Sequence, residues 1–349
     1  MSSLPRLAEL GAAAQHALSA VLRGSPPTGL GTTPRELVFQ RDKLELFRVR
    51  RRAAGLASSV PLLLIPPLMV RPYIYDLQPE HSLLATLRDA GFDVFLLDFG
   101  VPDAADAEVR LDDYVLDWVP TCIEQTLARS GASRVAVVGY CMGGLFGLIH
   151  VGTHEDPRVG ALVTIGSPVN FRRLGPITIG ARLSAPLMDP VVSLVGNVPG
   201  ELSSLVFKLL SGPRILRSHV DLLRNLDDEE HLQSFRAINF WINDMIPCPR
   251  EAFRQLYREI ILGNKLRKGT LLFRGKKCDL GRVTCPVLSF AGEQDIIAPP
   301  DSIREIIRLV GAADRRLITA PGGHVGVVAG HHAPERVWRP MVEWLGERL

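Results

Sequence analysis

The sequence predicts an α/β protein whose core is a mostly parallel, doubly wound sheet with a helical insertion. Three observations predict this fold class. Short apolar runs alternate with helical stretches, which is the pattern of a sheet with helices on both faces. The runs are apolar throughout, as in strands buried on both sides. The alternation also stops in the middle of the chain and then resumes, which indicates an inserted segment.

The elements expected from these patterns are as follows, in chain order. Extended segments or strands are expected at 36–39, 44–49, 62–65, 94–97, 135–138 and 162–165. Helices between them are expected at 81–89, 111–130 and 141–153. After a mostly helical stretch with Gly and Pro breaks, the core resumes with a strand at 287–291, a helix at 302–310, a strand at 316–320 and a helix at 334–349.

These elements divide the chain into four segments. Residues 1–33 are predicted to form an amphipathic helix and a linker, because apolar residues recur at offsets of three and four before a Gly- and Pro-rich stretch. Residues 34–170 and 278–349 are predicted to form the two parts of the core, and residues 171–277 a helical cap or lid. The N-terminal helix has two interpretations, packing on its own core or docking on a partner, since periodicity does not identify the partner.

Composition and patterning exclude several classes of protein. Lys plus Arg number 40 and Asp plus Glu 37, and this net charge of +3 is too balanced for a dedicated nucleic-acid binder. The longest apolar run, 60–70, has 11 residues and contains prolines, whereas a membrane span needs about 20. The first residues lack the pattern of a secretory signal. We therefore expect a cytoplasmic protein with neither a nucleic-acid partner nor a membrane span.

The strongest chemical signal is the run Gly-Tyr-Cys-Met-Gly-Gly at 139–144, which follows an expected strand and begins a helix. It matches the nucleophile elbow G-x-S-x-G of the α/β-hydrolase fold, with cysteine in place of serine. Glycines are needed there because the sharp turn brings backbone segments too close for side chains. Cys141 is therefore a candidate nucleophile whose thiolate is favoured by the helix N-terminus. The alternative is a buried, inert cysteine.

A thiol nucleophile needs a base, and the base needs an orienting acid. In this fold the three residues follow the order nucleophile, acid, histidine. Asp295 follows the expected strand at 287–291, and His324 follows the strand at 316–320 after two glycines. We therefore predict a triad of Cys141, Asp295 and His324. Glu293 is a rival acid, and a structural loop histidine is the alternative for His324.

Acyl transfer also requires hydrogen-bond donors for the oxyanion. The backbone N–H of Met142 is expected to be one donor, and a residue after the strand at 62–65 the other. The two prolines that follow this strand have no N–H. Leu68 or Met69 is therefore expected to supply the second donor.

No cofactor and no metal are expected. The sequence has no glycine-rich fingerprint for a dinucleotide or nucleotide phosphate. The five cysteines are scattered, without a C-x-x-C pair, so neither a disulfide framework nor a zinc knuckle is indicated. His150 and His154 lie one helical turn apart, but without a glutamate between them they are interpreted as a solvated helix face.

At these residues the sequence resembles the catalytic subunit of polyhydroxyalkanoate synthases, most of all the class III type that works with a second subunit. The resemblance covers the chain from about Pro34 to its end. Beyond the elbow, it includes the blocks Arg71-Pro72-Tyr73, Asp98-Phe99-Gly100, Leu111-Asp112-Asp113-Tyr114, Gly166-Ser167-Pro168-Val169, Asn264-Lys265-Leu266 and Gly323-His324-Val325-Gly326. The chain carries Val70, Phe99 and Ile296 where members often have Asn, Trp and His.

The resemblance implies transfer of (R)-3-hydroxyacyl groups from coenzyme A thioesters to a growing polyester, with release of coenzyme A. Cys141, Asp295 and His324 match the family's catalytic residues, with Asp295 either orienting His324 or assisting the hydroxyl. The resemblance also implies a second synthase subunit as partner, a homodimer or hetero-oligomer, and a location at the surface of cytoplasmic polyester granules.

Two other functions are compatible with the same residues. One is a hydrolase on the same scaffold, such as a thioesterase, an intracellular polyester depolymerase or a dienelactone-hydrolase-like enzyme, because fold and triad do not separate polymerisation from hydrolysis. The other is a non-catalytic protein that binds granules or a partner through its N-terminal helix. Substitution of Cys141 would abolish activity in an enzyme and change nothing in a scaffold.

Overall fold

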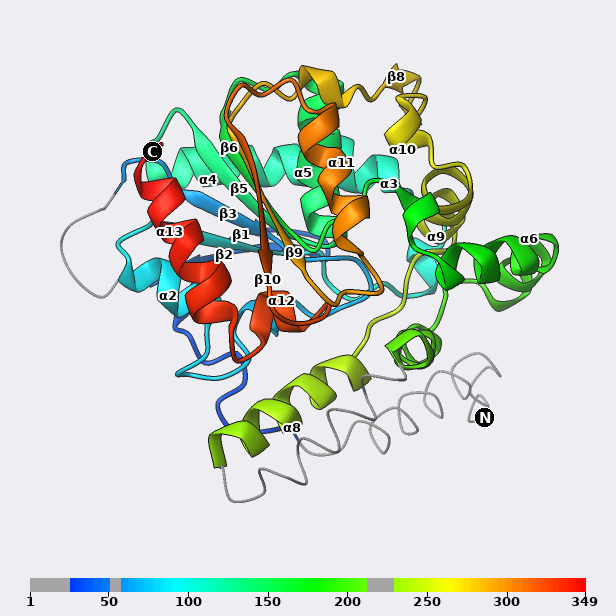
Figure 1. Ribbon diagram of the computed structural model, residues 1–349, viewed down its shortest axis with the longest axis horizontal. Helices are drawn as coiled ribbons and strands as arrows, with labels where there is room; N and C mark the ends of the chain where they lie inside the picture. The colour runs from blue at the N-terminus through cyan, green and yellow to red at the C-terminus, as the bar shows by residue number, and fades with distance from the viewer. Residues whose placement is uncertain (1–25, 51–57, 212–228) are drawn as a thin grey trace, which may run out of the picture.

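The structure, a computed structural model, describes residues 26–50, 58–211 and 229–349 (Figure 1). The predicted N-terminal helix lies outside the described residues. The main sheet has eight strands in the order β1-β2-β4-β3-β5-β6-β9-β10. Their bounds are β1 Arg35–Arg41, β2 Leu44–Val49, β3 Leu62–Ile65, β4 Val94–Asp98, β5 Val135–Tyr140, β6 Val159–Ile165, β9 Val287–Gly292 and β10 Arg315–Ala320.

The sheet is parallel except at one edge. β1 pairs with β2, and β2 with β4, in antiparallel register. All the pairs from β4 to β10 are parallel. The prediction of a mostly parallel sheet wound in both directions is therefore confirmed.

Helices cover both faces of this sheet. Figure 1 shows α4 (Val119–Ser130), α5 (Met142–His154) and α11 (Pro300–Leu309) on one side, and α2 (Leu83–Asp89), α12 (Gly326–Ala329) and α13 (Arg339–Gly346) on the other. The side chains of β3 alternate between the two faces. Leu63 and Ile65 join one hydrophobic core, and Leu62 and Leu64 the other. Burial on both sides explains why this strand is a continuous apolar run.

The helix predicted at 111–130 is present but interrupted. α3 (Leu111–Asp113) continues through a π-helical turn (Tyr114–Trp118) into α4. Pro120 lies in the first turn of α4 and has no N–H to donate to the preceding turn. A wider turn before a proline is the expected consequence. The last helix repeats the pattern, with a π-helical turn (Pro334–Trp338) before α13 and Pro340.

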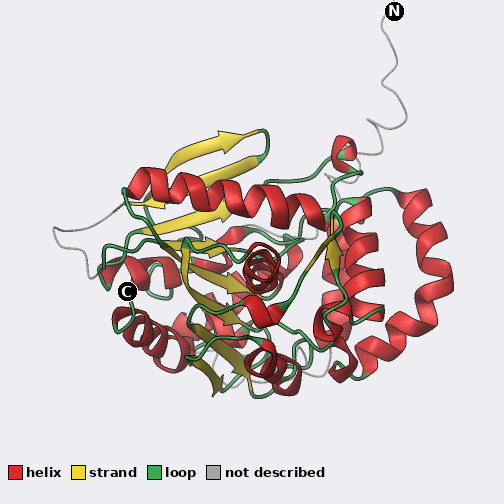
Figure 2. Ribbon diagram, turned by 90° about the horizontal axis from the view of Figure 1, so that it is seen from above, coloured by secondary structure: helices red, strands yellow, loops and turns green. Residues whose placement is uncertain are grey.

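The described residues between β6 and β9 are mostly helical, and α6 and α9 lie beyond one end of the strands (Figure 1 and Figure 2). A short hairpin of β7 (Leu272–Phe273) and β8 (Lys276–Lys277) was not predicted, because two-residue strands carry no periodicity. The domain boundaries at 171 and 277 stay predictions. The described helices of this stretch are η4 Phe171–Arg173, α6 Pro176–Val195, a helix at 200–211, α8 Glu229–Asn243, α9 Arg250–Gln255, a π-helical turn Leu256–Leu262, α10 Lys265–Lys268 and η6 Leu280–Arg282.

Two further observations concern the helices. None of them, within residues 26–50, 58–211 and 229–349, is long and apolar enough to cross a membrane.

The interpretation of His150 and His154 as a solvated face is wrong for His150, which is buried with Nε2 2.9 Å from Asp156 Oδ2. α5 is buried along nearly its whole length, so only His154 at its end is exposed.

Candidate active site

Cys141 lies between β5 and α5 with φ 51° and ψ −115°. A positive φ is unfavourable for a residue with a side chain, so the surrounding structure must hold this conformation. Neighbouring backbone lies very close: a Cβ on Gly139 would be 2.3 Å from Gly144 N, and one on Gly143 would be 2.0 Å from Ile65 O. The glycines around Cys141 are therefore required by close backbone approach.

His324 and Asp295 meet at the same edge of the sheet, after β10 and β9. His324 Nδ1 is 2.7 Å from Asp295 Oδ2, and both residues are buried. Asp295 Oδ1 accepts hydrogen bonds from the N–H groups of Ile297 and Ala298, both at 2.8 Å. One carboxylate oxygen thus fixes Asp295 in its loop, and the other fixes the imidazole. Glu293, the rival acid, is exposed.

The Cys141 side chain lies close enough to His324 to affect the protonation of its imidazole. Burial alone lowers the pKa of His324. The charges of Asp295 and Cys141, with the hydrogen bond to Asp295, outweigh burial and raise this pKa to about 10. The structure therefore brings together the three residues predicted for a triad.

The remaining cysteines have a different environment. Burial raises the pKa of the Cys122, Cys248, Cys278 and Cys285 thiols, so they stay protonated at neutral pH. In the part of the chain that the structure describes, no three or more His, Cys, Asp or Glu side chains gather as a metal site.

Tyr140 was not predicted as a functional residue, yet it supports His324. Its ring centroid is 5.1 Å from that of His324, and its hydroxyl donates to His324 O at 3.1 Å. Gly166 packs against the imidazole of His324, since a Cβ on Gly166 would be 3.4 Å from His324 Cε1. The elbow motif accepts any residue type at position 140, so the sequence gives no signal for Tyr140. Only the fold shows what its ring contacts.

The loop after β3 runs beside the start of α5, as the predicted oxyanion site requires. A Cβ on Gly143 would be 2.8 Å from Pro66 O. Met142 is the first residue of α5, where a backbone N–H has no acceptor within the helix. Met69 has φ 67°. The assignment of Leu68 or Met69 as the second donor stays a prediction.

Residues of the helical segment between β6 and β9 lie over the carboxyl ends of the strands, where the candidate site is. The ring of Phe207 is centred 6.5 Å from that of His324. Ser203 Oγ is 3.5 Å from Met69 Sδ, and Ile246 N donates to Met69 O at 2.9 Å. The segment therefore contacts both His324 and the loop after β3 that carries Leu68 and Met69.

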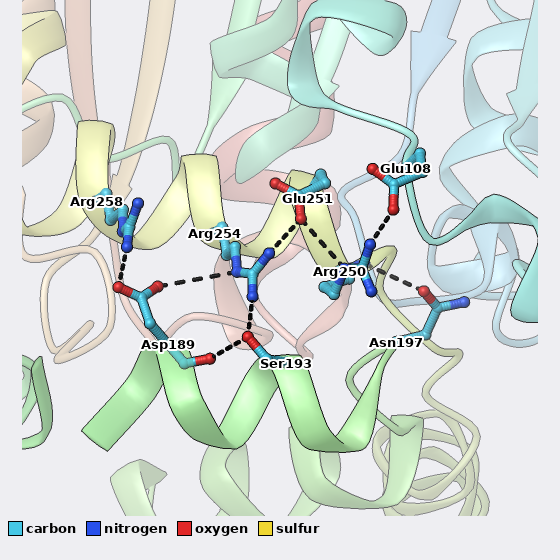
Figure 3. A network of polar contacts seen from close by, with 8 residues as sticks. All are labelled: Glu108, Asp189, Ser193, Asn197, Arg250, Glu251, Arg254 and Arg258. Carbon is cyan, nitrogen blue, oxygen red and sulfur yellow. Dashed lines mark hydrogen bonds and ion pairs between the residues drawn. The ribbon is translucent and has the colours of Figure 1, made fainter. Parts of the chain in front are cut away.

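A polar network joins α6 to α9 within this segment (Figure 3). Asp189 of α6 pairs with Arg258 and lies 3.9 Å from Arg254. Arg254 also contacts Ser193, whose hydroxyl donates to Asp189 O at 2.7 Å. At the far end Arg250 pairs with Glu108, which precedes α3. Because these groups are partly exposed, each pair contributes at most about 1 kcal/mol, and their number rather than their strength orients the two helices.

Comparison with known proteins gives a consistent result. The profile of a family described as "alpha/beta hydrolase fold" matches residues 71–330. The chain is 33% identical to "Poly(3-hydroxyalkanoate) polymerase subunit PhaC" of Allochromatium vinosum, over 91% of this chain and 90% of that protein. The protein of the same name from Thiocystis violacea is also 33% identical, over 91% and 89%. The one from Synechocystis is 30% identical, over 91% and 86%.

Solved structures with a similar fold are more distant in sequence. A soluble variant of monoglyceride lipase from Saccharomyces cerevisiae has a TM-score of 0.59 at 16% identity, and the match covers 93% of this chain and 99% of that one. Monoacylglycerol lipase of Paleococcus ferrophilus has a TM-score of 0.53 at 18% identity, with 87% and 100% covered. At these identities the similarity shows the fold alone.

Proposed function

Because this chain belongs to the poly(3-hydroxyalkanoate) polymerase subunit PhaC family, within the α/β-hydrolase fold, we propose that it polymerises (R)-3-hydroxyacyl groups from coenzyme A thioesters. The acyl group is carried on Cys141. The observation that supports this mechanism is the pairing of His324 with Asp295 at the end of the sheet where Cys141 lies, close enough to affect the imidazole.

The first step is an exchange of thioesters. The Cys141 thiolate attacks the carbonyl carbon of the substrate, a C–S bond to Cys141 forms, and the C–S bond to coenzyme A breaks. The departing thiolate takes a proton from the His324 imidazolium. The acyl group is still a thioester, so it remains activated for transfer to an alcohol.

The second step transfers the acyl group to a hydroxyl. His324, now neutral, takes the proton of the 3-hydroxyl, whose oxygen attacks the acyl carbon and displaces Cys141 as a thiolate. An ester bond forms and the thiolate-imidazolium pair is restored. In both steps the N–H of Met142, with that of Leu68 or Met69, stabilises the negative charge on the carbonyl oxygen.

Asp295 acts in this scheme by orienting His324. Its Oδ2 faces His324 Nδ1 at 2.7 Å, and its Oδ1 is held by two backbone N–H groups. Both oxygens are therefore engaged, which favours orientation of the imidazole over direct activation of the substrate hydroxyl.

Exclusion of water separates polymerisation from hydrolysis, because water would release the acyl group as a free acid. The ring of Phe207 lies near that of His324, and Ile246 N donates to Met69 O; both contacts support a covered acyl-enzyme. Since the relatives are named subunits, we include a second synthase subunit in the proposal. We also include oligomerisation and a location at the surface of polyester granules in the cytoplasm.

The test is incubation of the purified chain with 3-hydroxybutyryl-coenzyme A, with and without a companion subunit encoded beside it. We expect thiol release together with polyester that is extractable into chloroform, and neither with Cys141→Ala. Thiol release with only free acid in both conditions would identify a hydrolase instead. Full activity in Cys141→Ala would exclude Cys141 as the nucleophile.

A further inference from the structure

The ladder between β3 and β5 ends where the elbow begins. Ala136 aligns with Leu62, and its N–H donates to Pro61 O at 2.9 Å. On a parallel strand, every second residue donates to the same neighbour. Two steps further along β5, the N–H of Tyr140 therefore faces Ile65 O, the last acceptor of β3.

The hydrogen-bond ladder between β3 and β5 does not continue beyond Ile65 and Tyr140. The next two residues of β3, Pro66 and Pro67, have no N–H to donate to β5. Beyond this point β3 continues into the predicted oxyanion loop, and β5 continues into Cys141 and Met142. The two chain segments that build the site thus separate directly after Tyr140 and Ile65.

A tyrosine hydroxyl from another part of the chain lies between Tyr140 N and Ile65 O and forms a hydrogen bond with each of them. Tyr75, in the 3₁₀ helix η1 (Pro72–Tyr75), donates to Ile65 O at 2.7 Å and accepts from Tyr140 N at 2.9 Å. Its side chain is 1% exposed, so no water competes for these bonds. Tyr140 in turn donates its own hydroxyl to His324 O.

We propose that Tyr75 is a positioning residue for the reaction: its hydroxyl fixes the distance between the nucleophile elbow and the predicted oxyanion loop. The inference rests on the proposed role of Cys141 as nucleophile. Through Ile65 O the hydroxyl holds the start of the loop that carries Leu68 and Met69. Through Tyr140 N it holds the residue before Cys141. Catalytic groups displaced by a fraction of an ångström lose much of their effect, so this bridge controls rate more than substrate binding.

The matched pair of variants is Tyr75→Phe and Tyr257→Phe. Both remove one hydroxyl from a buried tyrosine that bonds to a backbone carbonyl, but Tyr257 bonds to Ala181 of α6 rather than to the elbow. We expect Tyr75→Phe to lower kcat for thioester turnover about ten-fold with KM changed less than about two-fold. Tyr257→Phe should leave both constants unchanged.

A second readout does not depend on the substrate. The rate at which iodoacetamide alkylates Cys141, followed by peptide mass spectrometry from pH 5 to 10, reports the thiolate beside His324. We expect the pH profile of alkylation to move to higher pH in Tyr75→Phe. Loss of the bridge would shift Cys141 and also Tyr140, whose hydroxyl donates to His324 O. An unchanged profile with unchanged kcat in folded Tyr75→Phe would overturn the proposal. Formation of free acid instead of polyester would contradict only the proposed function.

Hydrogen exchange in the unmodified protein tests the bridge without any substitution. The amide of Tyr140 is expected to be among the most protected in the chain, because its acceptor, the Tyr75 hydroxyl, is buried and itself bonded to Ile65 O. Exchange of this amide at the rate of a surface loop would overturn the proposal even if Tyr75→Phe failed to fold.

Discussion

Tyr73 Oη donates to Asp244 Oδ2 at 2.8 Å, which joins the loop after β3 to the end of α8. Arg71 Nε is 3.6 Å from the same oxygen, and Trp241 Nε1 donates to Arg71 O at 3.0 Å. The helical segment therefore holds the loop that leads away from the predicted oxyanion residues. These contacts fix the position of the loop relative to α8.

Asp244→Ala removes a buried acceptor that serves both a hydroxyl and a guanidinium. We expect the free energy of unfolding to fall by about 1–3 kcal/mol and kcat to fall with it, because the loop loses its tie to α8. Urea denaturation and turnover kinetics measure the two effects. Asp244→Asn is the control, since its amide oxygen still accepts from Tyr73; equal losses in both variants would show that the charge rather than the hydrogen bond matters.

Asp295→Asn tests the orienting role of the carboxylate. The amide can present an N–H toward His324 Nδ1 and thereby favour the wrong tautomer. We expect kcat to fall on the order of 10³-fold or more at pH 7, with little change in the folded structure. Glu293→Gln, at the exposed rival acid, should keep full activity. Nearly full turnover in Asp295→Asn would contradict the predicted triad.

The pH dependence of stability follows from the raised pKa of His324. Its pKa is about 10 in the folded protein against an ordinary 6.5, so the folded state binds this proton more tightly. The stabilisation is complete below about pH 6.5 and is lost as pH rises through 10. We expect the free energy of unfolding to fall toward pH 10, by at most about 1.4 kcal/mol per pH unit. The difference between wild type and His324→Gln in denaturant titrations isolates this contribution; a difference that grows with pH would refute it.

Gly143→Ala tests the packing of the elbow. Its Cβ would lie 2.0 Å from Ile65 O, which is backbone and cannot move without shifting β3. We expect loss of several kcal/mol of stability, about 3 or more, or failure to fold. Gly180→Ala in α6 is the control, because no atom lies within 4 Å of its Cβ position. Alanine there should raise stability by about 0.5–1 kcal/mol, as measured by thermal unfolding.

Much of the fold and of the candidate site could be predicted because the signals are local. β3 and β5 are continuous apolar runs, and the glycines around Cys141 are required by a turn that spans only a few residues. Chain order then selected Asp295 and His324, which the structure brings within 2.7 Å of each other.

Contacts between distant segments leave no such signal. Tyr75 reaches Tyr140 across 65 positions, and Tyr73 reaches Asp244 across 171. Nothing near Tyr75 in the sequence distinguishes a bridging hydroxyl from an ordinary core tyrosine. For the same reason His150 was assigned to solvent, since its burial depends on packing around α5 and on Asp156 in the following loop.

The positive φ of Cys141 has a consequence for how this protein evolves. Glycine adopts such a conformation without the cost that any other residue carries, which is of order 1–3 kcal/mol. A glycine in place of Cys141 would relieve that strain and remove the sulfur that we propose carries the acyl group. At this position, therefore, a substitution that increases the stability of the protein would at the same time abolish the proposed activity.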